Sequence, residues 1–278
     1  MSVALARARS FLFLPADRLE RLPTALASGA HAVILDLEDA VADAAIVEAR
    51  AALLRAVRDL PAGTRTRLLV RINAAGTPRH EEDLLLLRRL TGLRLGAVML
   101  PKCEEAASVG RVARLAATPV VPLIESARGL HAVDSIAGAH GVLRLAFGHL
   151  DFQLDLGMQC GPDERELDGV RLQIVMASRR AGLPAPSDGV TVALEDDALL
   201  AADAQRSRRL GFGAKLCIHP RQVAVVNASF GPDAAQLDWA RRVVAASQGA
   251  AGAFRLDGEM VDAPVLARAR AWLSTGSG

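Results

Sequence analysis

The chain has 278 residues, 51% of them hydrophobic and 23% charged, so it is long enough to bury a sizeable core in one large domain or two small ones. Its 33 basic residues nearly balance 31 acidic ones, and only 3% of residues are aromatic, with no Tyr. The surface therefore lacks the one-sided charge and the stacking rings typical of nucleic-acid-binding proteins. No apolar stretch reaches the ~18 residues of a membrane span, so we expect no membrane partner.

Cysteine usage favours a reducing compartment. Cys103, Cys160 and Cys217 are odd in number, lie far apart and form no CxxC pair, which argues against a disulfide framework or a zinc ribbon. The apolar run at 11–14 ends at Pro15 and is too short for a signal peptide. We therefore expect a cytoplasmic protein.

Eight short runs rich in Val, Ile, Leu and Phe recur along the chain, each followed by a longer amphipathic segment, as in βα units. In chain order they lie at 10–15, 32–38, 67–73, 97–102, 120–125, 142–148, 189–192 and 214–220. Because the runs are apolar throughout, they indicate strands buried on both faces of a parallel sheet. Eight such repeats in ~220 residues predict an α/β fold, a (β/α)8 TIM barrel.

Capping residues predict helices between these strands and after them. The predicted helices nearest the N-terminus lie at 18–29, 43–59 and 80–90, and those after the eighth strand at 222–230, 235–247 and 265–273. A Gly- and Ala-rich stretch at 249–264 precedes the last helix. We therefore divide the chain into a catalytic barrel at 1–230 and a C-terminal helical extension at 231–278 that could cover an active site as a lid.

Polar residues at the carboxyl ends of barrel strands are the candidates for function, because the active site of this fold forms there. The ends of consecutive predicted strands carry Glu125 and Asp151, which neighbouring-strand spacing would place roughly 5 Å apart. Two carboxylates so close repel each other unless a cation lies between them, and Mg²⁺ is typically held by one or two carboxylates. The alternative is that each carboxylate caps the helix that follows it.

Three basic side chains at strand ends need an explanation. Arg71 ends a buried strand, where a guanidinium costs several kcal/mol unless it binds an anion or forms an internal ion pair, here with Asp36 or Glu38. Lys102 and Lys215 are candidate Schiff-base nucleophiles. Neither position favours that role strongly, because Lys102 precedes an acidic pair and Lys215 starts a strand.

Seven segments together resemble a known family, in order and almost from end to end. They are RSFLFLPADRLER at 9–21, AVILDLEDAV at 32–41, VRIN at 70–73, VMLPK at 98–102, PLIES at 122–126, FGHLDFQLDLG at 147–157 and GFGAKLCIHPRQV at 211–223. This combination is similar to the citrate lyase β-subunit-like proteins of the HpcH/HpaI aldolase superfamily. The resemblance implies an enzyme that uses Mg²⁺ or Mn²⁺ to make or break a carbon–carbon bond between an acyl-CoA and a 2-oxo acid.

The resemblance also implies roles for individual residues. Glu125 and Asp151 would be the metal ligands, and Arg71 would stabilise the developing oxyanion. Asp36 and Glu38 would hold Arg71 and metal-bound waters in place. Contacts with the CoA thioester are implied for Arg18, Ile218, His219 and Pro220.

The C-terminal segment LDGEMVDAP at 256–264 resembles the lid of malyl-CoA and citramalyl-CoA lyases. By this resemblance Asp262 would act as an acid or base in the site of a neighbouring subunit, in a homotrimer or homohexamer. The alternative is that Asp262 is the N-cap of the helix that begins at Ala263-Pro264.

The resemblance favours reversible cleavage of malyl-CoA or citramalyl-CoA into acetyl-CoA and glyoxylate or pyruvate. Three alternatives stay open: a citryl-CoA lyase acting as a citrate lyase β subunit, a Schiff-base aldolase that uses Lys102 or Lys215, and a non-catalytic CoA-binding scaffold.

Overall fold

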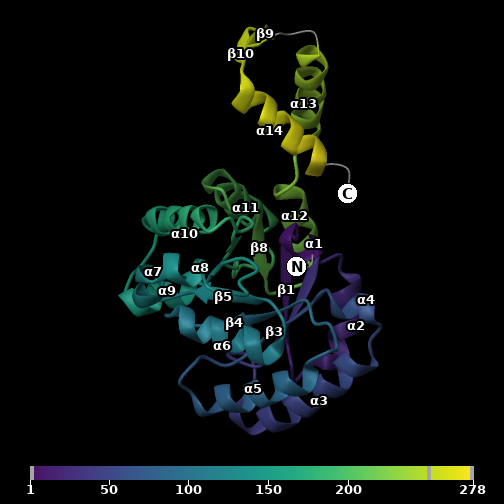
Figure 1. Cartoon of the computed structure of the whole chain (residues 1–278), viewed down its shortest axis with the longest axis vertical. Coiled ribbons are helices and arrows are strands. Elements are labelled where there is room, and N and C mark those ends of the chain that lie inside the picture. Colours follow the sequence, from purple (N-terminus) through teal and green to yellow (C-terminus); the bar gives the residue numbers. More distant parts are fainter. Residues whose placement is uncertain (1–2, 249–251, 276–278) are drawn as a thin grey trace. The chain divides into compact units, whose positions relative to one another are not determined.

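A computed structural model of the chain, which describes residues 3–248 and 252–275, contains eight parallel strands closed into a barrel (Figure 1). The strands are β1 (Ser10–Pro15), β2 (Ala32–Asp36), β3 (Leu68–Arg71), β4 (Ala97–Leu100), β5 (Val120–Ile124), β6 (Ala146–Phe147), β7 (Ser187–Asp188) and β8 (Ala214–Cys217). Each strand pairs with the next, and β8 pairs with β1. The predicted (β/α)8 barrel is confirmed.

Helices fill the connections between the strands and cover the outside of the barrel, as Figure 1 shows. They are α1 (Val3–Ala6), η1 (Leu19–Arg21), α2 (Leu22–Ala27), η2 (Asp43–Ala45), α3 (Ile46–Asp59), α4 (Ala62–Arg65), α5 (Pro78–Leu90), α6 (Ala106–Ala116), α7 (Ala127–His131), α8 (Val133–Ala137), α9 (His149–Leu156), η3 (Arg165–Leu167), α10 (Asp168–Arg180), α11 (Asp197–Leu210) and α12 (Gln222–Ser229). None of the helices in the described residues is long and apolar enough to cross a membrane.

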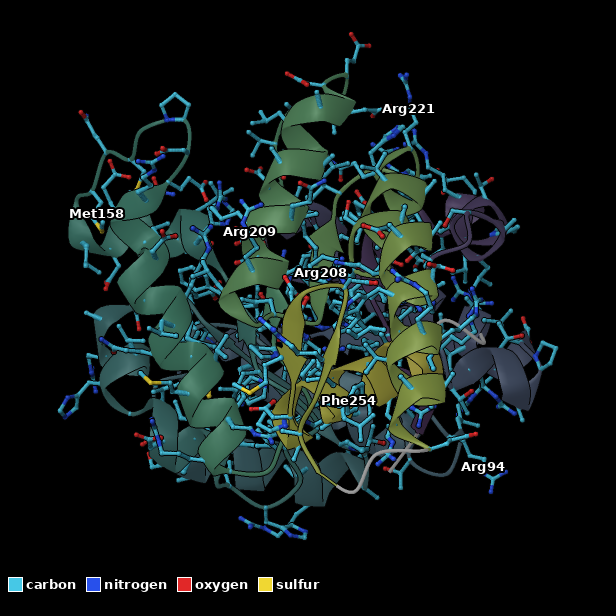
Figure 2. All side chains as sticks on the ribbon, turned by 90° about the horizontal axis from the view of Figure 1, so that it is seen from above. Arg94, Met158, Arg208, Arg209, Arg221 and Phe254 are labelled. Carbon is cyan, nitrogen blue, oxygen red and sulfur yellow. The ribbon has the colours of Figure 1, made fainter. Side chains whose placement is uncertain are left out.

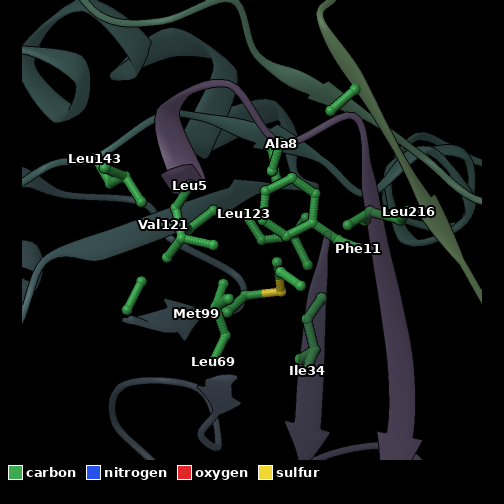
Figure 3. Close-up of a cluster of buried hydrophobic side chains, with 14 residues drawn as sticks. Leu5, Ala8, Phe11, Ile34, Leu69, Met99, Val121, Leu123, Leu143 and Leu216 are labelled. Atoms are coloured by element: carbon green, nitrogen blue, oxygen red, sulfur yellow. The ribbon is translucent and has the colours of Figure 1, made fainter. Parts of the chain in front are cut away.

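The barrel is filled by apolar side chains that point inward from its strands (Figure 3). Phe11, Ile34, Met99 and Leu216 are buried there, together with Leu5 of α1. The strands read as continuous apolar runs because their other face is covered by helices.

The floor of the barrel holds a buried arginine, Arg144, whose hydrogen bonds go to backbone carbonyls. The Arg144 guanidinium donates hydrogen bonds to the backbone carbonyls of Leu5 (3.3 Å), Ala8 (2.9 Å) and Ala185 (3.1 Å). It also lies over the Phe11 ring, with the guanidinium carbon 5.2 Å from the ring centroid. Carbonyl oxygens and an aromatic face thus take the place of an anion.

The seventh strand differs from the prediction. The apolar run at 189–192 was expected to form it, but β7 consists of Ser187 and Asp188, both fully buried. Burial of Asp188 is possible because Arg171 binds its carboxylate, with Nε 3.1 Å from Oδ2. A search for apolar runs misses a strand that contains a residue such as Asp188, whose carboxylate is satisfied by side chains of α10 and α11.

The chain divides into two compact units, Met1–Asn227 and Ala228–Gly278. The second contains α13 (Ala234–Ser247), the antiparallel strands β9 (Phe254–Leu256) and β10 (Glu259–Val261), and α14 (Ala263–Thr275). Its own core includes Trp239 and Trp272, whose ring centroids lie 5.4 Å apart. The hairpin was not predicted, although Asp257-Gly258, with φ of 52° and 85°, is a typical hairpin turn.

Candidate active site

A cavity of about 310 Å³ lies at the carboxyl ends of the barrel strands. Its lining includes five of the predicted site residues: Asp36, Arg71, Glu125, Asp151 and Ile218. The apolar part of the lining includes Phe13, Leu123, Phe147, Val190 and Leu216. The barrel therefore brings the predicted metal ligands and the predicted anion-binding arginine into one cavity.

Arg71 is held by a two-pronged ion pair with Asp36. The two residues are register partners on β2 and β3, and Nε and Nη2 of Arg71 lie 2.6 and 2.7 Å from the two carboxylate oxygens. Nη1 also lies 2.8 Å from Glu38. Burial alone would lower the pKa of Arg71, but the hydrogen bond and charge of Asp36 and the charge of Glu38 raise it above its usual range. Arg71 is a permanent, pre-oriented cation at the cavity wall.

Glu38 links Arg71 to a second cation, Lys102. The Lys102 ammonium lies 2.7 Å from Glu38 Oε1. Burial raises the pKa of Glu38 to about 7, against the opposing effect of Arg71 and Lys102. For Lys102, burial alone would lower the pKa, but the Glu38 carboxylate raises it above its usual range. Lys102 is therefore protonated near neutral pH, which disfavours it as a Schiff-base nucleophile.

Glu125 is a buried carboxylate that faces other carboxylates. Its side chain is 3% exposed, and Oε1 accepts a 2.6 Å hydrogen bond from the Lys102 backbone N–H. Burial, followed by the charges of Glu38 and Asp151, raises the pKa of Glu125 to about 8. Gly148 makes room for this carboxylate, because a Cβ at Gly148 would lie 2.3 Å from Glu125 Oε2.

The alternative in which Glu125 and Asp151 are helix caps is wrong. Ser126 caps α7 by accepting a hydrogen bond from the Gly129 N–H. Gly148 occupies the N-cap position of α9, so Asp151 lies within the first helical turn. Neither carboxylate is therefore used as a helix N-cap, and both line the cavity.

The donor set fits a hard divalent cation. Within residues 3–248 and 252–275, no group of three or more His, Cys, Asp and Glu side chains is arranged to hold a metal ion. Mg²⁺ needs no such group, because one or two carboxylates hold it while water and substrate complete its octahedron. Burial is the main cause of the raised pKa of Glu125, and the charges of Glu38 and Asp151 add to it; a cation bound between the carboxylates would favour the ionised form of Glu125.

The residues expected to contact CoA are more scattered. Ile218 lines the cavity, whereas Arg18 lies in a separate surface groove of about 510 Å³ beside α3. The turn after β8 is held by His219, whose Nδ1 accepts a 3.3 Å hydrogen bond from the Arg221 N–H, and Pro220 lies between these two residues. Asp262 belongs to the second unit, where its Oδ1 accepts a 3.1 Å hydrogen bond from the Val265 N–H as an N-cap of α14.

One residue of the cavity had no assigned role in the sequence. His149 lines the cavity, and its Nε2 lies 3.2 Å from Glu164 Oε1. Its position after the sixth strand was visible in the sequence. Glu164 was not, because it lies beyond α9 and reaches His149 only through the fold.

Comparison with known proteins identifies the family. The model of the HpcH/HpaI aldolase/citrate lyase family matches residues 9–220, which include the whole barrel up to the turn after β8. This chain belongs to the HpcH/HpaI aldolase/citrate lyase family. It is therefore an enzyme of the carbon–carbon lyase class, and the cavity described above lies where this class of barrel carries its active site.

Relatives of this HpcH/HpaI family member match it over nearly its full length. A citrate lyase subunit beta-like protein of Mycobacterium tuberculosis is 41% identical, over 95% of this chain and 93% of that protein. A (3S)-malyl-CoA thioesterase of Cereibacter sphaeroides is 31% identical, over 96% of this chain and 93% of that protein. The crystal structure of CitE from M. tuberculosis with magnesium, acetoacetate and coenzyme A is similar with a TM-score of 0.86 and 38% identity, over 98% and 100% of the two chains.

Proposed function

We propose that this protein is a Mg²⁺-dependent lyase that reversibly cleaves a short 3-hydroxyacyl-CoA, such as malyl-CoA or citramalyl-CoA, into acetyl-CoA and a 2-oxo acid. The observation that carries the proposal is the convergence of Glu125, Asp151 and Arg71 on one cavity. The magnesium and coenzyme A bound to the M. tuberculosis relative support it, as does the malyl-CoA thioesterase name of the C. sphaeroides relative.

The residues of the cavity divide the task between them. Glu125 and Asp151 would hold the cation, which when bound supplies a Lewis acid and a template for the oxygens of the 2-oxo acid portion. Arg71 offers fixed donors to a carboxylate or to the enolate oxygen that forms during cleavage. Asp36 keeps the guanidinium in that orientation.

Cleavage requires two proton transfers. The 3-hydroxyl loses its proton as its carbon becomes the carbonyl of the 2-oxo acid, and the electron pair of the broken carbon–carbon bond passes to the thioester enolate. The enolate carbon then takes up a proton to give acetyl-CoA. We propose Asp262 as the acid or base for the acetyl-CoA carbon, which requires its helix cap to open or to be shared.

With that role for Asp262, each active site would be complete only in an oligomer, because a neighbouring subunit would supply Asp262. We propose a cytoplasmic homotrimer or homohexamer in which the segment carrying Asp262 serves a neighbouring subunit. Light scattering on the purified protein measures the mass of the assembly, and a monomer that is fully active would contradict the proposal.

The Schiff-base alternative has less support. Lys102 is protonated by its pairing with Glu38. Lys215 is 1% exposed and donates a 2.7 Å hydrogen bond to the Gly189 carbonyl. Burial lowers the pKa of Lys215, against the opposing charges of Asp188 and Asp203, which by itself would favour a nucleophile. Lys215 does not, however, line the cavity. We expect borohydride with pyruvate to trap no adduct on either lysine.

The decisive experiment offers malyl-CoA, citramalyl-CoA and citryl-CoA separately, each with Mg²⁺ and with EDTA. Cleavage of one of the first two that EDTA abolishes is the expected result. Glu125→Gln should remove turnover and leave the circular dichroism spectrum unchanged. Activity that survives removal of the metal would contradict the metal role, and cleavage of citryl-CoA alone would favour the citrate lyase β-subunit alternative.

A further inference from the structure

One wall of the cavity is backed by buried charged side chains for which the proposed reaction has no use. The wall is formed by Gly148, His149 and Gly189. Behind it lie three carboxylates and three cations: Glu164, Asp188, Asp203, Arg171, Arg206 and Lys215. The cluster is balanced in charge when His149 is neutral, and it joins the wall to α10 and α11.

Glu164 is the member that contacts His149. One of its carboxylate oxygens lies 3.2 Å from His149 Nε2, and the other lies 2.5 Å from Arg171 and 3.0 Å from Arg206. Arg171 in turn binds Asp188 at 3.1 Å. Burial alone would raise the pKa of Glu164, but His149 and Arg171 lower it to about 2, so Glu164 is a carboxylate throughout the neutral range.

Glu164 adopts an unusual backbone conformation, with a φ of 47°. A side chain other than glycine rarely occupies this left-handed region, and such residues persist where surrounding contacts hold them. Glu164 follows the loop that leaves α9, where Figure 2 shows Met158. Figure 2 also shows Arg208 and Arg209 at the end of α11, the helix that supplies Arg206. The contacts with α10 and α11 therefore tie this loop to the barrel.

Two glycines lie against side chains of this region: Gly189 packs against His149, and Gly148 packs against Glu125. A Cβ at Gly189 would lie 2.1 Å from His149 Nδ1, so the imidazole fits between Glu164 and the bare backbone of β7's end. Gly148, the preceding residue, fits against Glu125 in the same way. Asp151 lies in the same first turn of α9. A displacement of His149 would therefore move Asp151 relative to Glu125.

We propose that Glu164 is a positioning residue for the cation site: it holds His149 against Gly189 and so fixes the separation between Asp151 and Glu125. The inference rests on the proposed function, since it concerns the same cation. It differs from a purely structural role in one respect, because a structural role would change stability without changing cation affinity.

The test uses the full chain and measures Mn²⁺ binding by electron paramagnetic resonance in the absence of substrate. Glu164→Gln removes the charge and keeps the shape, and the dissociation constant for Mn²⁺ should rise about 10- to 100-fold. The matched control is Asp163→Asn. Asp163 is the adjacent carboxylate and pairs with Arg165 at 2.6 Å on the surface, so its loss should leave Mn²⁺ binding unchanged. Unchanged Mn²⁺ binding in Glu164→Gln would overturn the proposal.

A second variant covers the case in which Glu164→Gln does not fold. His149→Ala removes the link and leaves Glu164 with its two arginines, and it should weaken Mn²⁺ binding by a similar factor. Adding Glu164→Gln to it should then have no further effect, whereas independent, additive effects would overturn the proposal. A wild-type protein that cleaves no thioester, but whose Mn²⁺ binding depends on Glu164, refutes the proposed function and keeps this inference. If the wild type cleaves the thioester but its Mn²⁺ binding does not depend on Glu164, the proposed function stands and this inference is refuted. A wild type that binds no Mn²⁺ refutes both proposals.

Discussion

Arg71 shows how a single side chain is prepared for anion binding. A guanidinium at a buried strand end has two explanations, an internal ion pair or a bound anion, and the structure contains the ion pair. The pair does not exclude the anion. Asp36 uses both carboxylate oxygens on one edge of the guanidinium, and Arg71 also lines the cavity, with its guanidinium carbon 4.8 Å from the centre of the Phe13 ring.

Replacing Arg71 with Lys should therefore be costly even though the charge is kept. A lysine cannot make the two-pronged contact with Asp36, so the cation loses its fixed direction. We expect kcat to fall at least about 100-fold, as when one oxyanion donor is removed. Arg67→Lys, at the opposite end of the β3 region, is the control, because Arg67 donates to the Ala30 carbonyl. Equal kcat values for the two variants would contradict the role of Arg71.

Glu164 makes a pH-dependent contribution to stability. Its pKa is about 2 in the folded protein, against an ordinary value of 4.5. A carboxylate with a depressed folded pKa stabilises the fold above its unfolded pKa, and the contribution is lost as pH falls from 4.5 toward 2. This corresponds to about 3 kcal/mol at pH 7, and to about half of that at pH 3. Urea unfolding measures the free energy of unfolding of the wild type and of Glu164→Gln. The difference between the two proteins should be smaller at pH 3 than at pH 7. A gap of constant size would show that the carboxylate charge is not its source.

The junction of β6 and α9 is the element on which the site depends most closely. β6 has only two residues, and the α9 helix begins two residues later at His149. Gly148 between them has φ −100° and ψ 76°, a conformation open to other residues, so the backbone alone does not require glycine. The requirement comes from the Glu125 carboxylate that lies against it.

Gly148→Ala should therefore damage function more than stability. The new methyl group would meet Glu125 at 2.3 Å and displace it, so we expect loss of turnover in a protein that still unfolds cooperatively. Gly169→Ala in α10 is the matched control, since a Cβ there would meet nothing within 4 Å. Enzyme assays and thermal unfolding of both variants distinguish the two effects. Wild-type turnover in Gly148→Ala would mean that Glu125 can move without consequence.

The elements differ in how far sequence could predict them. β1 begins and ends where its apolar run does, because burial on both faces leaves a continuous signal. β6 is shorter than its run at 142–148, since Val142 forms only an isolated bridge with Val120. The charges behind the cavity wall could not be predicted, because Glu164, Arg171 and Asp188 meet only when distant elements pack.

The residues of the candidate site also differ in how far the sequence could predict them. The strand-end residues Asp36, Arg71, Glu125 and Asp151 were found by position, since barrel topology brings strand ends together. Glu164 follows a helix and a loop, and its contact with His149 depends on the path of that loop. Spacing along the chain carries no signal for such a contact.

At the scale of the whole molecule, each unit has a core of its own. The barrel cluster contains only residues up to Leu216, and the cluster around Trp239 and Trp272 contains only residues of the second unit. A chain that ends at Gly231, after α12, should therefore fold and unfold cooperatively, as measured by circular dichroism. It should lack turnover because Asp262 is absent, and full-length Asp262→Asn should reproduce that loss. Full activity in the shortened chain would remove Asp262 from the mechanism.

The floor of the barrel has a consequence for how the protein is made. The Arg144 guanidinium donates hydrogen bonds to the carbonyls of Leu5, Ala8 and Ala185, so the N-terminal segment and the segment around residue 185 must be present together. On the ribosome, Leu5 and Ala8 emerge long before Ala185. The set of carbonyls that binds Arg144 is therefore complete only after residue 185 has been synthesised. A peptide fused directly before Leu5 would lie beside the Arg144 hydrogen bonds, which form late. A purification tag at the other terminus avoids it.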